Sequence, residues 1–384
     1  MQLMKILALK GSSENNVLRV FIDELSSALC SLGVAVDVLD FEEHSDLSYF
    51  LKILNDKSYD GIFSFNALLG DLIITPSNFS FLAELKKPYI AWMVDNPIYH
   101  HARLKNEIPK RHIICPSRHH LQFLRQAKII CQSSVLLAGA SNFNQQPVAF
   151  SNRNIQVLLL ATWMGEPVKF WLESEDKLVK ELAPIAIELL MKDSSCNSVQ
   201  ALQISARSLG VNFEFSEAWI NFCVHLQSYI RCLDRIETVR CLANSGIPIT
   251  LVGNGWESNL KNTANINFCS NIDASDAWKM YDDSKIVINL NSSNGACERL
   301  FNAIGRGACV VSDESETLKD YFKINKDIAF FDRRNPNTII SLIKDLLKDN
   351  RAEWMAKRGW IKVGNAHTWK NRAIDILNIF KKFN

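Results

Sequence analysis

The sequence predicts an α/β protein made of two Rossmann-like domains. Apolar runs of strand length alternate with segments of helical periodicity, beginning with the strand Met4–Leu9 and the helix Val17–Leu32. A polar linker at 151–154 interrupts this alternation, which then resumes with the strand Ile155–Ala161. A chain of 384 residues is long enough for two cores of ordinary size. We therefore expect a parallel sheet with covering helices in each domain.

The linker sets the predicted domain boundaries. We place an N-terminal Rossmann-like domain at 1–150, a second Rossmann-like domain at 151–366 and a C-terminal helix at 367–384. Long apolar segments at helical spacing predict a helical connecting region at 166–233, inside the second domain. The aromatic residues of that region are expected to pack in a helical core.

Composition and charge exclude several classes of protein. The chain is 47% hydrophobic and 22% charged, as in folded globular proteins, and its net charge of +2 gives no reason to expect a nucleic-acid partner. The ten cysteines are scattered without a CxxC pair, so we expect neither a zinc site, nor disulfides, nor a bound cofactor. Neither a signal peptide nor an apolar run of about 20 residues is found, which predicts a cytoplasmic protein without a membrane span.

A compact βαβ pattern over 285–313 is the most informative part of the chain. The strand Ile286–Leu290 leads into a polar loop, then into a helix over Glu298–Ile304 and a second strand over Ala308–Ser312. The loop therefore lies at the carboxyl end of a parallel strand. Ligands of open α/β sheets bind at that edge, so we expect a ligand there.

Three further positions are candidate site residues. Asp95 directly follows the strand Tyr89–Val94 and precedes a rigid Asn-Pro step; it either acts as a general base or binding carboxylate, or caps the next turn. Gly11, in the loop after the first strand, is either a ligand contact or a simple turn glycine. The Gly253-x-Gly255-Trp256 sequence allows close approach of a ligand, and Trp256 could stack on a base.

Three passages carry a resemblance to a known family. They are Arg235-xxx-Val239-Arg240 with Gly253–Trp256, then Asn289-Leu290 through Glu298-Arg299-Leu300-Phe301-Asn302-Ala303 to Ser312-Asp313, and finally His367-Thr368-Trp369-xx-Arg372. Their order resembles the GT-B glycosyltransferases of the group 1 type, and within them the spore maturation protein CgeB family. The match is clear from Arg235 to Arg372 and loose before it.

The resemblance implies two facing domains with a nucleotide-diphosphate sugar in the cleft between them. It implies metal-independent transfer of the sugar to an unknown acceptor, since the chain carries no DxD triad. The helix N-terminus near Cys297 and the first-turn Arg299 would stabilise the departing diphosphate. Asp95 would be the base if the anomeric configuration is inverted, and would orient acceptor or sugar if it is retained.

The remaining donor contacts implied by the resemblance are Arg235, Gly253, Gly255, Trp256, Asn291, Asn294, Glu298, Asn302 and Gly11. One position departs from the family: Asn302 stands where its members carry a glutamate that binds the ribose hydroxyls. Either Glu298 takes over part of that role, or donor affinity is weaker, or the protein is inactive. The alternative function is therefore a non-catalytic GT-B-like binding or assembly protein.

Overall fold

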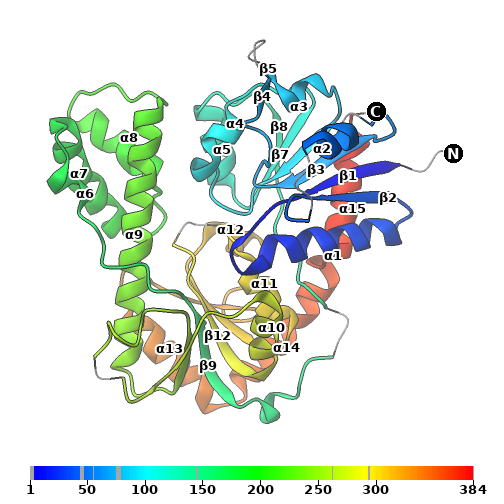
Figure 1. Ribbon diagram of the computed structural model, residues 1–384. Helices are drawn as coiled ribbons and strands as arrows, with labels where there is room; N and C mark the ends of the chain where they lie inside the picture. The colour runs from blue at the N-terminus through cyan, green and yellow to red at the C-terminus, as the bar shows by residue number, and fades with distance from the viewer. Residues whose placement is uncertain are drawn as a thin grey trace. The chain divides into compact units, whose positions relative to one another are not determined.

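The chain folds into two compact units, each containing a six-stranded parallel sheet (Figure 1). Unit 1 comprises Met1–Ser141 and Ala366–Asn384, and unit 2 comprises Asn142–Asn365. The predicted α/β class with two Rossmann-like sheets is confirmed. The computed structural model describes residues 4–43, 47–54, 56–74, 79–143, 146–261, 263–292 and 295–383.

The sheet of unit 1 has the strand order β2-β1-β3-β6-β7-β8. Its strands are β1 (Lys5–Lys10), β2 (Ala35–Asp40), β3 (Gly61–Phe65), β6 (Tyr89–Trp92), β7 (Arg111–Cys115) and β8 (Gln132–Val135). A short antiparallel pair, β4 (Ile73–Ile74) with β5 (Phe79–Ser80), lies outside this sheet. The helices of the unit are α1 (Val17–Ser31), α2 (Leu47–Leu54), α3 (Phe81–Glu84), α4 (His101–Leu104) and α5 (Arg118–Gln126).

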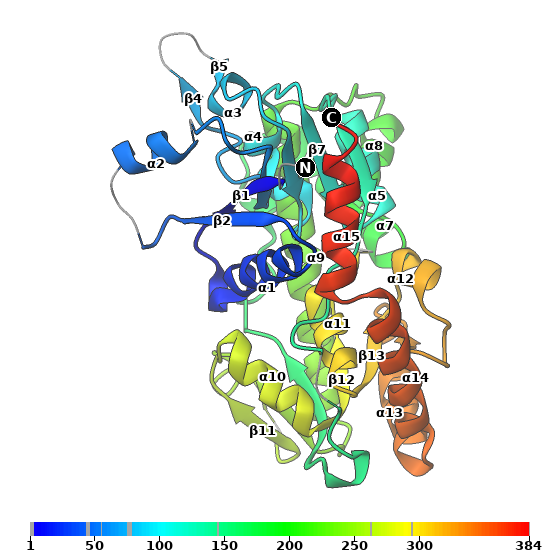
Figure 2. The ribbon, with the colours of Figure 1, turned by 90° about the vertical axis from the view of Figure 1, so that its right-hand side faces the viewer.

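The last helix of the chain, α15 (Trp369–Phe380), completes the core of unit 1. It packs beside α1, as Figure 2 shows, and the Trp369 ring lies 4.9 Å from the ring of Phe21. Phe380 covers Gly61 of β3 so closely that a Cβ atom at Gly61 would lie 2.3 Å from its ring. The chain therefore leaves unit 1 before Asn142 and returns to it at Ala366.

The sheet of unit 2 has the order β11-β10-β9-β12-β13-β14. Its strands are β9 (Ile155–Leu160), β10 (Ile249–Val252), β11 (Ile266–Cys269), β12 (Ser284–Asn289), β13 (Cys309–Asp313) and β14 (Ala329–Phe331). From β9 the next two strands, β10 and β11, are added on one side of the sheet, and β12, β13 and β14 are then added on the other side. The order thus reverses between β9 and β12, and this switch point is where such sheets bind ligands.

Helices α6 to α9 form the helical part of unit 2, with bounds Phe170–Glu173, Lys177–Lys192, Ser198–Ser208 and Glu217–Ala243. The 27-residue α9 is one continuous helix from the Ser216 cap onward (Figure 1). Helices α6 and α7 are separate, and both lie in the region predicted to be helical. The other helices are α10 (Ala274–Asp283), α11 (Glu298–Gly305), α12 (Glu316–Tyr321), α13 (Asn337–Lys348) and α14 (Arg351–Ala366).

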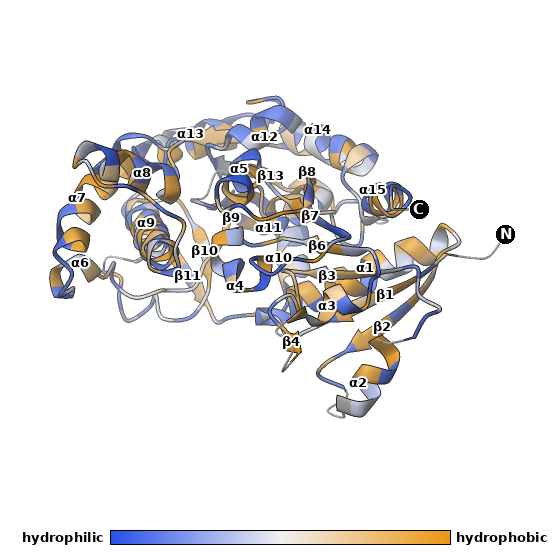
Figure 3. Ribbon diagram, turned by 90° about the horizontal axis from the view of Figure 1, so that it is seen from above, coloured by the Kyte–Doolittle hydropathy of each residue, from blue (hydrophilic) through white to orange (hydrophobic). Residues whose placement is uncertain are grey.

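The hydropathy of the helices explains how they pack. Helices such as α7 and α14 carry hydrophobic residues beside hydrophilic ones along their length (Figure 3). In α13 the buried positions are Ile339, Ile343 and Leu346, which follow helical spacing and join the core with the strands. The candidate site residues lie in loops at the carboxyl edges of the two sheets and in helices α9 and α11.

Candidate active site

The βαβ pattern of the sequence forms as predicted, from β12 through α11 to β13. The strands pair in parallel, with Ile286 opposite Cys309, and Cys297 is the N-cap of α11. The helix therefore begins at the predicted place, and its first backbone N–H groups lie beside the switch point of the sheet. Asn294, a predicted donor contact in the preceding loop, lies outside the described residues.

Three consecutive carbonyl groups at the end of β9, Leu160–Thr162, accept hydrogen bonds from predicted site residues. Arg299 Nη1 donates to the first at 2.6 Å, Trp256 Nε1 to the second, and Arg235 Nη1 to the third at 2.8 Å. These side chains come from α11, from the loop after β10 and from α9. The structure therefore brings together three residues that are far apart in the sequence.

Two guanidinium groups thus converge on the carboxyl end of the central strand. Arg235 is buried, whereas the Arg299 side chain is 28% exposed and lies 4.0 Å from the Glu298 carboxylate. Arginine remains protonated in proteins, so this edge of the sheet carries fixed positive charge. With the N-terminus of α11 alongside, the arrangement suits a diphosphate group.

The glycine-rich turn after β10 contacts the protein itself. Gly253 has φ 147°, and a Cβ atom there would lie 2.1 Å from the carbonyl oxygen of Ala161. At Gly255, with φ 88°, a Cβ atom would lie 2.9 Å from Trp163. Trp256 is fully buried, 4.9 Å from the Trp163 ring. The close approach expected for a ligand is therefore made by the loop after β9, and Trp256 has no free face for a base.

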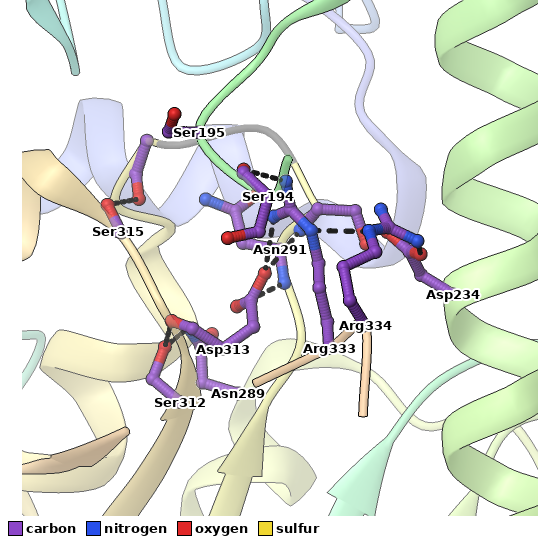
Figure 4. A network of polar contacts seen from close by, with 12 residues as sticks. Ser194, Ser195, Asp234, Asn289, Asn291, Ser312, Asp313, Ser315, Arg333 and Arg334 are labelled. Carbon is purple, nitrogen blue, oxygen red and sulfur yellow. Dashed lines mark hydrogen bonds and ion pairs between the residues drawn. The ribbon is translucent and has the colours of Figure 1, made fainter. Parts of the chain in front are cut away.

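The loop after β12 is held by a buried carboxylate. Asp313, the last residue of β13, accepts the backbone N–H groups of Asn291 at 3.0 Å and Ser292 at 2.8 Å (Figure 4). Arg333 Nη1 donates to the same carboxylate at 3.2 Å, and its Nη2 donates to the carbonyl of Ser194. The backbone of Asn291 is thereby fixed next to the start of α11.

The same network joins the loop to α9 through Asp234. Arg334 binds the Asp234 carboxylate through both terminal nitrogens, the longer contact measuring 3.1 Å, and Arg333 Nε lies 3.6 Å from it (Figure 4). Burial raises the pKa of Asp234, and the two arginines oppose this rise. Asp313 and Asp234 thus carry charges matched by Arg333 and Arg334. Arg333 escaped the sequence analysis because it follows β14, a strand of three residues.

The position that departs from the family lies inside α11. Asn302 is buried, one helical turn beyond Glu298, whose side chain is more exposed. An amide at this buried position brings no charge into the interior, whereas a carboxylate would need a cationic partner. Glu298 therefore offers the accessible carboxylate of this helix.

Asp95, the candidate base, belongs to unit 1. It follows β6, its side chain is 58% exposed, and its Oδ2 accepts a hydrogen bond of 2.7 Å from Asn66 Nδ2. His100 Nε2 lies 3.4 Å from the same oxygen. The turn that follows has its own cap, because the Asn96 side chain accepts from the N–H of Ile98 at 3.1 Å. Asp95 is thus an accessible carboxylate with the Asn66 amide and the His100 ring beside it.

Gly11 also lies in unit 1, after β1. A Cβ atom there would lie 3.1 Å from the Leu68 side chain, so Gly11 borders the loop that follows β3.

Burial lowers the pKa of His120, at the start of α5, to about 3, so this imidazole stays neutral near pH 7 and adds no positive charge. The predicted site residues are therefore divided, with Gly11 and Asp95 in unit 1 and the others in unit 2.

Metal ligands and membrane spans were also sought in the described part of the chain. In the ranges given above, no three His, Cys, Asp or Glu side chains are grouped to hold a metal ion. No helix among the same residues is long and apolar enough to cross a bilayer. All ten cysteines are free thiols.

Comparison with known proteins bears on both the sequence and the fold. Residues 235–378 match the family model described as glycosyl transferase-like, which covers the βαβ unit and both arginines at the end of β9. No curated protein sequence matches the chain.

Solved glycosyltransferases share the architecture over nearly their whole length. Sucrose-phosphate synthase from Thermosynechococcus elongatus is 13% identical, covers 99% of this chain and 99% of its own, and has a TM-score of 0.57. A glycosyltransferase from Rickettsia africae is 13% identical, covers 100% of this chain and 99% of its own, and has a TM-score of 0.56. HepE from Anabaena, solved with UDP and glucose, is 11% identical, covers 98% of this chain and 99% of its own, and has a TM-score of 0.54. The chain therefore has the GT-B fold of glycosyltransferases, and its residues 235–378 match a glycosyl transferase-like family model.

Proposed function

We propose that the protein is a glycosyltransferase that moves a sugar from a nucleotide-diphosphate sugar to an acceptor hydroxyl group. The observation that carries this proposal is the pair of guanidinium groups, Arg235 and Arg299, at the end of β9 beside the N-terminus of α11. A diphosphate leaving group gains negative charge as it departs. Fixed positive charge and free N–H groups at that place stabilise the transition state more than the ground state.

The roles within the donor site follow from accessibility. Arg299 is the partly exposed guanidinium and takes the diphosphate, while the buried Arg235 supports it through the end of β9. Glu298 takes the ribose hydroxyls in place of the family glutamate, because Asn302 is buried and uncharged. Asn291 binds hydroxyls of the sugar, and from the sequence alone we propose the same role for Asn294. Since the chain has no DxD triad, we propose that no metal is needed.

Asp95 is the proposed general base. Its carboxylate takes the proton of the acceptor hydroxyl as the oxygen attacks the anomeric carbon, and the bond from that carbon to the diphosphate oxygen breaks. The products are the glycosylated acceptor and the nucleoside diphosphate. This route inverts the anomeric configuration, so the stereochemistry of the product tests the role of Asp95.

Release of nucleoside diphosphate from a panel of UDP-, GDP-, ADP- and dTDP-sugars tests the activity. UDP-sugars come first, because HepE is solved with UDP and glucose. We expect slow hydrolysis by the wild type, with water as acceptor, and a loss of about 100-fold in kcat/KM for Arg299→Met. Arg240→Met is the matched control, because Arg240 pairs with Glu166 on the surface of the same unit and should change the rate less than twofold. The absence of wild-type turnover with the whole panel contradicts the proposal.

A non-catalytic binding protein is the second candidate, favoured by Asn302 alone. Thermal-shift measurements with nucleoside diphosphates separate the two. A ligand at hundreds of times its Kd raises stability by about 3 kcal/mol. Stabilisation that survives Arg299→Met, together with no turnover, identifies a binding protein. We further propose, from the sequence motifs, that the chain belongs to the CgeB branch of the group 1 type and acts in the cytoplasm on soluble donors.

A further inference from the structure

The loop that follows β3 in unit 1 has an unusual backbone. Asn66, Ala67 and Leu69 all have positive φ, at 48°, 52° and 65°. Residues with a Cβ atom rarely adopt this left-handed region, and such residues gather at functional sites. The loop also lies at the switch point of the sheet, because β3 and β1 are neighbours there while β2 lies beyond β1.

Asn66 uses this backbone to direct its amide group at Asp95. Its Nδ2 donates to Asp95 Oδ2 at 2.7 Å, and its Oδ1 accepts the backbone N–H groups of Val94 at 2.9 Å and Asp95 at 3.2 Å. Because the amide nitrogen can only donate and the amide oxygen can only accept, the orientation of the group follows from its partners. One side chain therefore holds the carboxylate and the backbone that carries it.

Asn66 is itself held from several directions. Asn66 is 5% exposed, and its backbone N–H donates to the carbonyl of Trp92 at 2.8 Å. Arg103 Nη1 donates to the backbone carbonyl of Asn66 at 3.1 Å. The hydroxyl of Tyr89 donates to the carbonyl of Leu68 two residues later, at 3.0 Å. These bonds maintain the loop, so the position of the Asn66 amide is set before any substrate binds.

We propose that Asn66 is a positioning residue for Asp95, fixing the direction of its carboxylate toward the acceptor hydroxyl and keeping it charged. This inference rests on the proposed function, since it takes Asp95 as the base. An exposed aspartate side chain otherwise samples several rotamers, only some of which suit proton transfer. A hydrogen bond donated to the charged form favours that form over the protonated one.

Two substitutions separate this role from a structural one. Asn66→Gly keeps the left-handed backbone at no steric cost and removes the amide. Asn66→Asp keeps the size of the side chain but places a second carboxylate against Asp95. Asn106→Ala is the control, because Asn106 Nδ2 donates to the carbonyl of Gly70 in the same loop, at 2.9 Å, and its side chain serves only to secure the loop.

Two quantities are measured. The first is the titration midpoint of the Asp95 carboxyl group, followed through the NMR signal of its carboxyl carbon, which Asp95→Asn assigns. The second is the pH dependence of kcat for donor hydrolysis. We expect the midpoint and the acid limb of kcat to rise together, by about one pH unit in Asn66→Gly and by more in Asn66→Asp. We expect kcat to fall at least tenfold at pH 6 with KM nearly unchanged. Asn106→Ala should leave both midpoint and acid limb unmoved.

An unchanged midpoint in Asn66→Gly overturns the proposal, as does a midpoint that moves while the acid limb stays fixed. A shift of equal size in Asn106→Ala also overturns it, since general loosening of the loop would then explain the effect. If the midpoint moves but the wild type hydrolyses no sugar nucleotide, the failure lies with the proposed function instead. The hydrogen bond would then hold a carboxylate that serves no transfer reaction.

Discussion

Asp40, the last residue of β2, forms a two-pronged ion pair with Arg19. Arg19 Nη1 and Nη2 lie 2.8 and 2.6 Å from the two carboxylate oxygens, and Lys10 Nζ lies 3.6 Å away. Burial alone would raise the pKa of Asp40, but the hydrogen bonds from Arg19 and the Glu42 N–H, together with the charges of Arg19 and Lys10, outweigh it and lower the pKa to about 2. The folded protein therefore binds this proton more weakly than the unfolded chain does.

The lowered pKa of Asp40 determines how its contribution to stability depends on pH. Because the folded pKa lies below the unfolded value near 3.9, the contribution of the pair is complete above about pH 5 and declines as the pH falls toward 2. Asp40→Asn should lower the free energy of unfolding by about 2 kcal/mol at pH 7 and by much less at pH 2.5, as measured by urea denaturation. Asp345→Asn, which breaks an exposed pair with Lys348, should cost under about 0.5 kcal/mol. An equal loss from Asp40→Asn at both pH values would contradict the assignment.

At the scale of elements, the contact between the loops after β9 and β10 depends on Gly253. An alanine there would have to adopt φ 147° with its Cβ atom 2.1 Å from a backbone oxygen. Gly253→Ala should therefore lower the stability of unit 2 by about 3 kcal/mol or more, as read from chemical denaturation. Gly165→Ala is the control, since Gly165 also has a positive φ, at 86°, but open space around it, and should cost only about 1 kcal/mol. Equal losses would show that the contact is not tight.

Most elements could be predicted from local patterns, and the exceptions have physical reasons. The helix α11 was placed to within one residue, because apolar periodicity and two glycines mark its extent. Strand β14 was missed because three residues carry no periodicity. Arg111 and His112, the first two residues of β7, are both buried, and local patterns do not reveal this because charged residues rarely lie buried in a strand.

The candidate site was predictable only in part. Arg299 and Asp95 could be found, because a first helical turn and a strand end are local features. The part played by Asn66 could not, because its partner Asp95 is 29 positions away and the contact arises from sheet order. Arg333 and Asp234 are likewise brought together only by the packing of α9. The motif Gly253–Trp256 was found but given a ligand role, whereas the fold uses it for packing.

At the scale of the whole molecule, unit 1 is built from both ends of the chain. Ending the chain at residue 366 removes α15 and with it the buried side chains of Trp369, Ile376 and Phe380. Each contributes about 2 kcal/mol or more, so the loss approaches the entire stability of a typical domain. Amides of β1 and β3 should lose protection from hydrogen exchange, while those of β9 and β12 keep it. As a control, removing only residues 381–384 should leave both sheets protected. If ending the chain at residue 366 removed protection from both sheets, that result would contradict the division into units.

This division also bears on the order of events during synthesis. The ribosome completes β1 to β8 first, yet α15, the helix that covers Phe21, Phe65 and Trp92, is translated only after the whole of unit 2. Unit 2 is continuous in sequence, so it has all its residues before unit 1 does. Unit 2 is thus expected to finish folding before unit 1, whose apolar face stays uncovered until α15 has been translated.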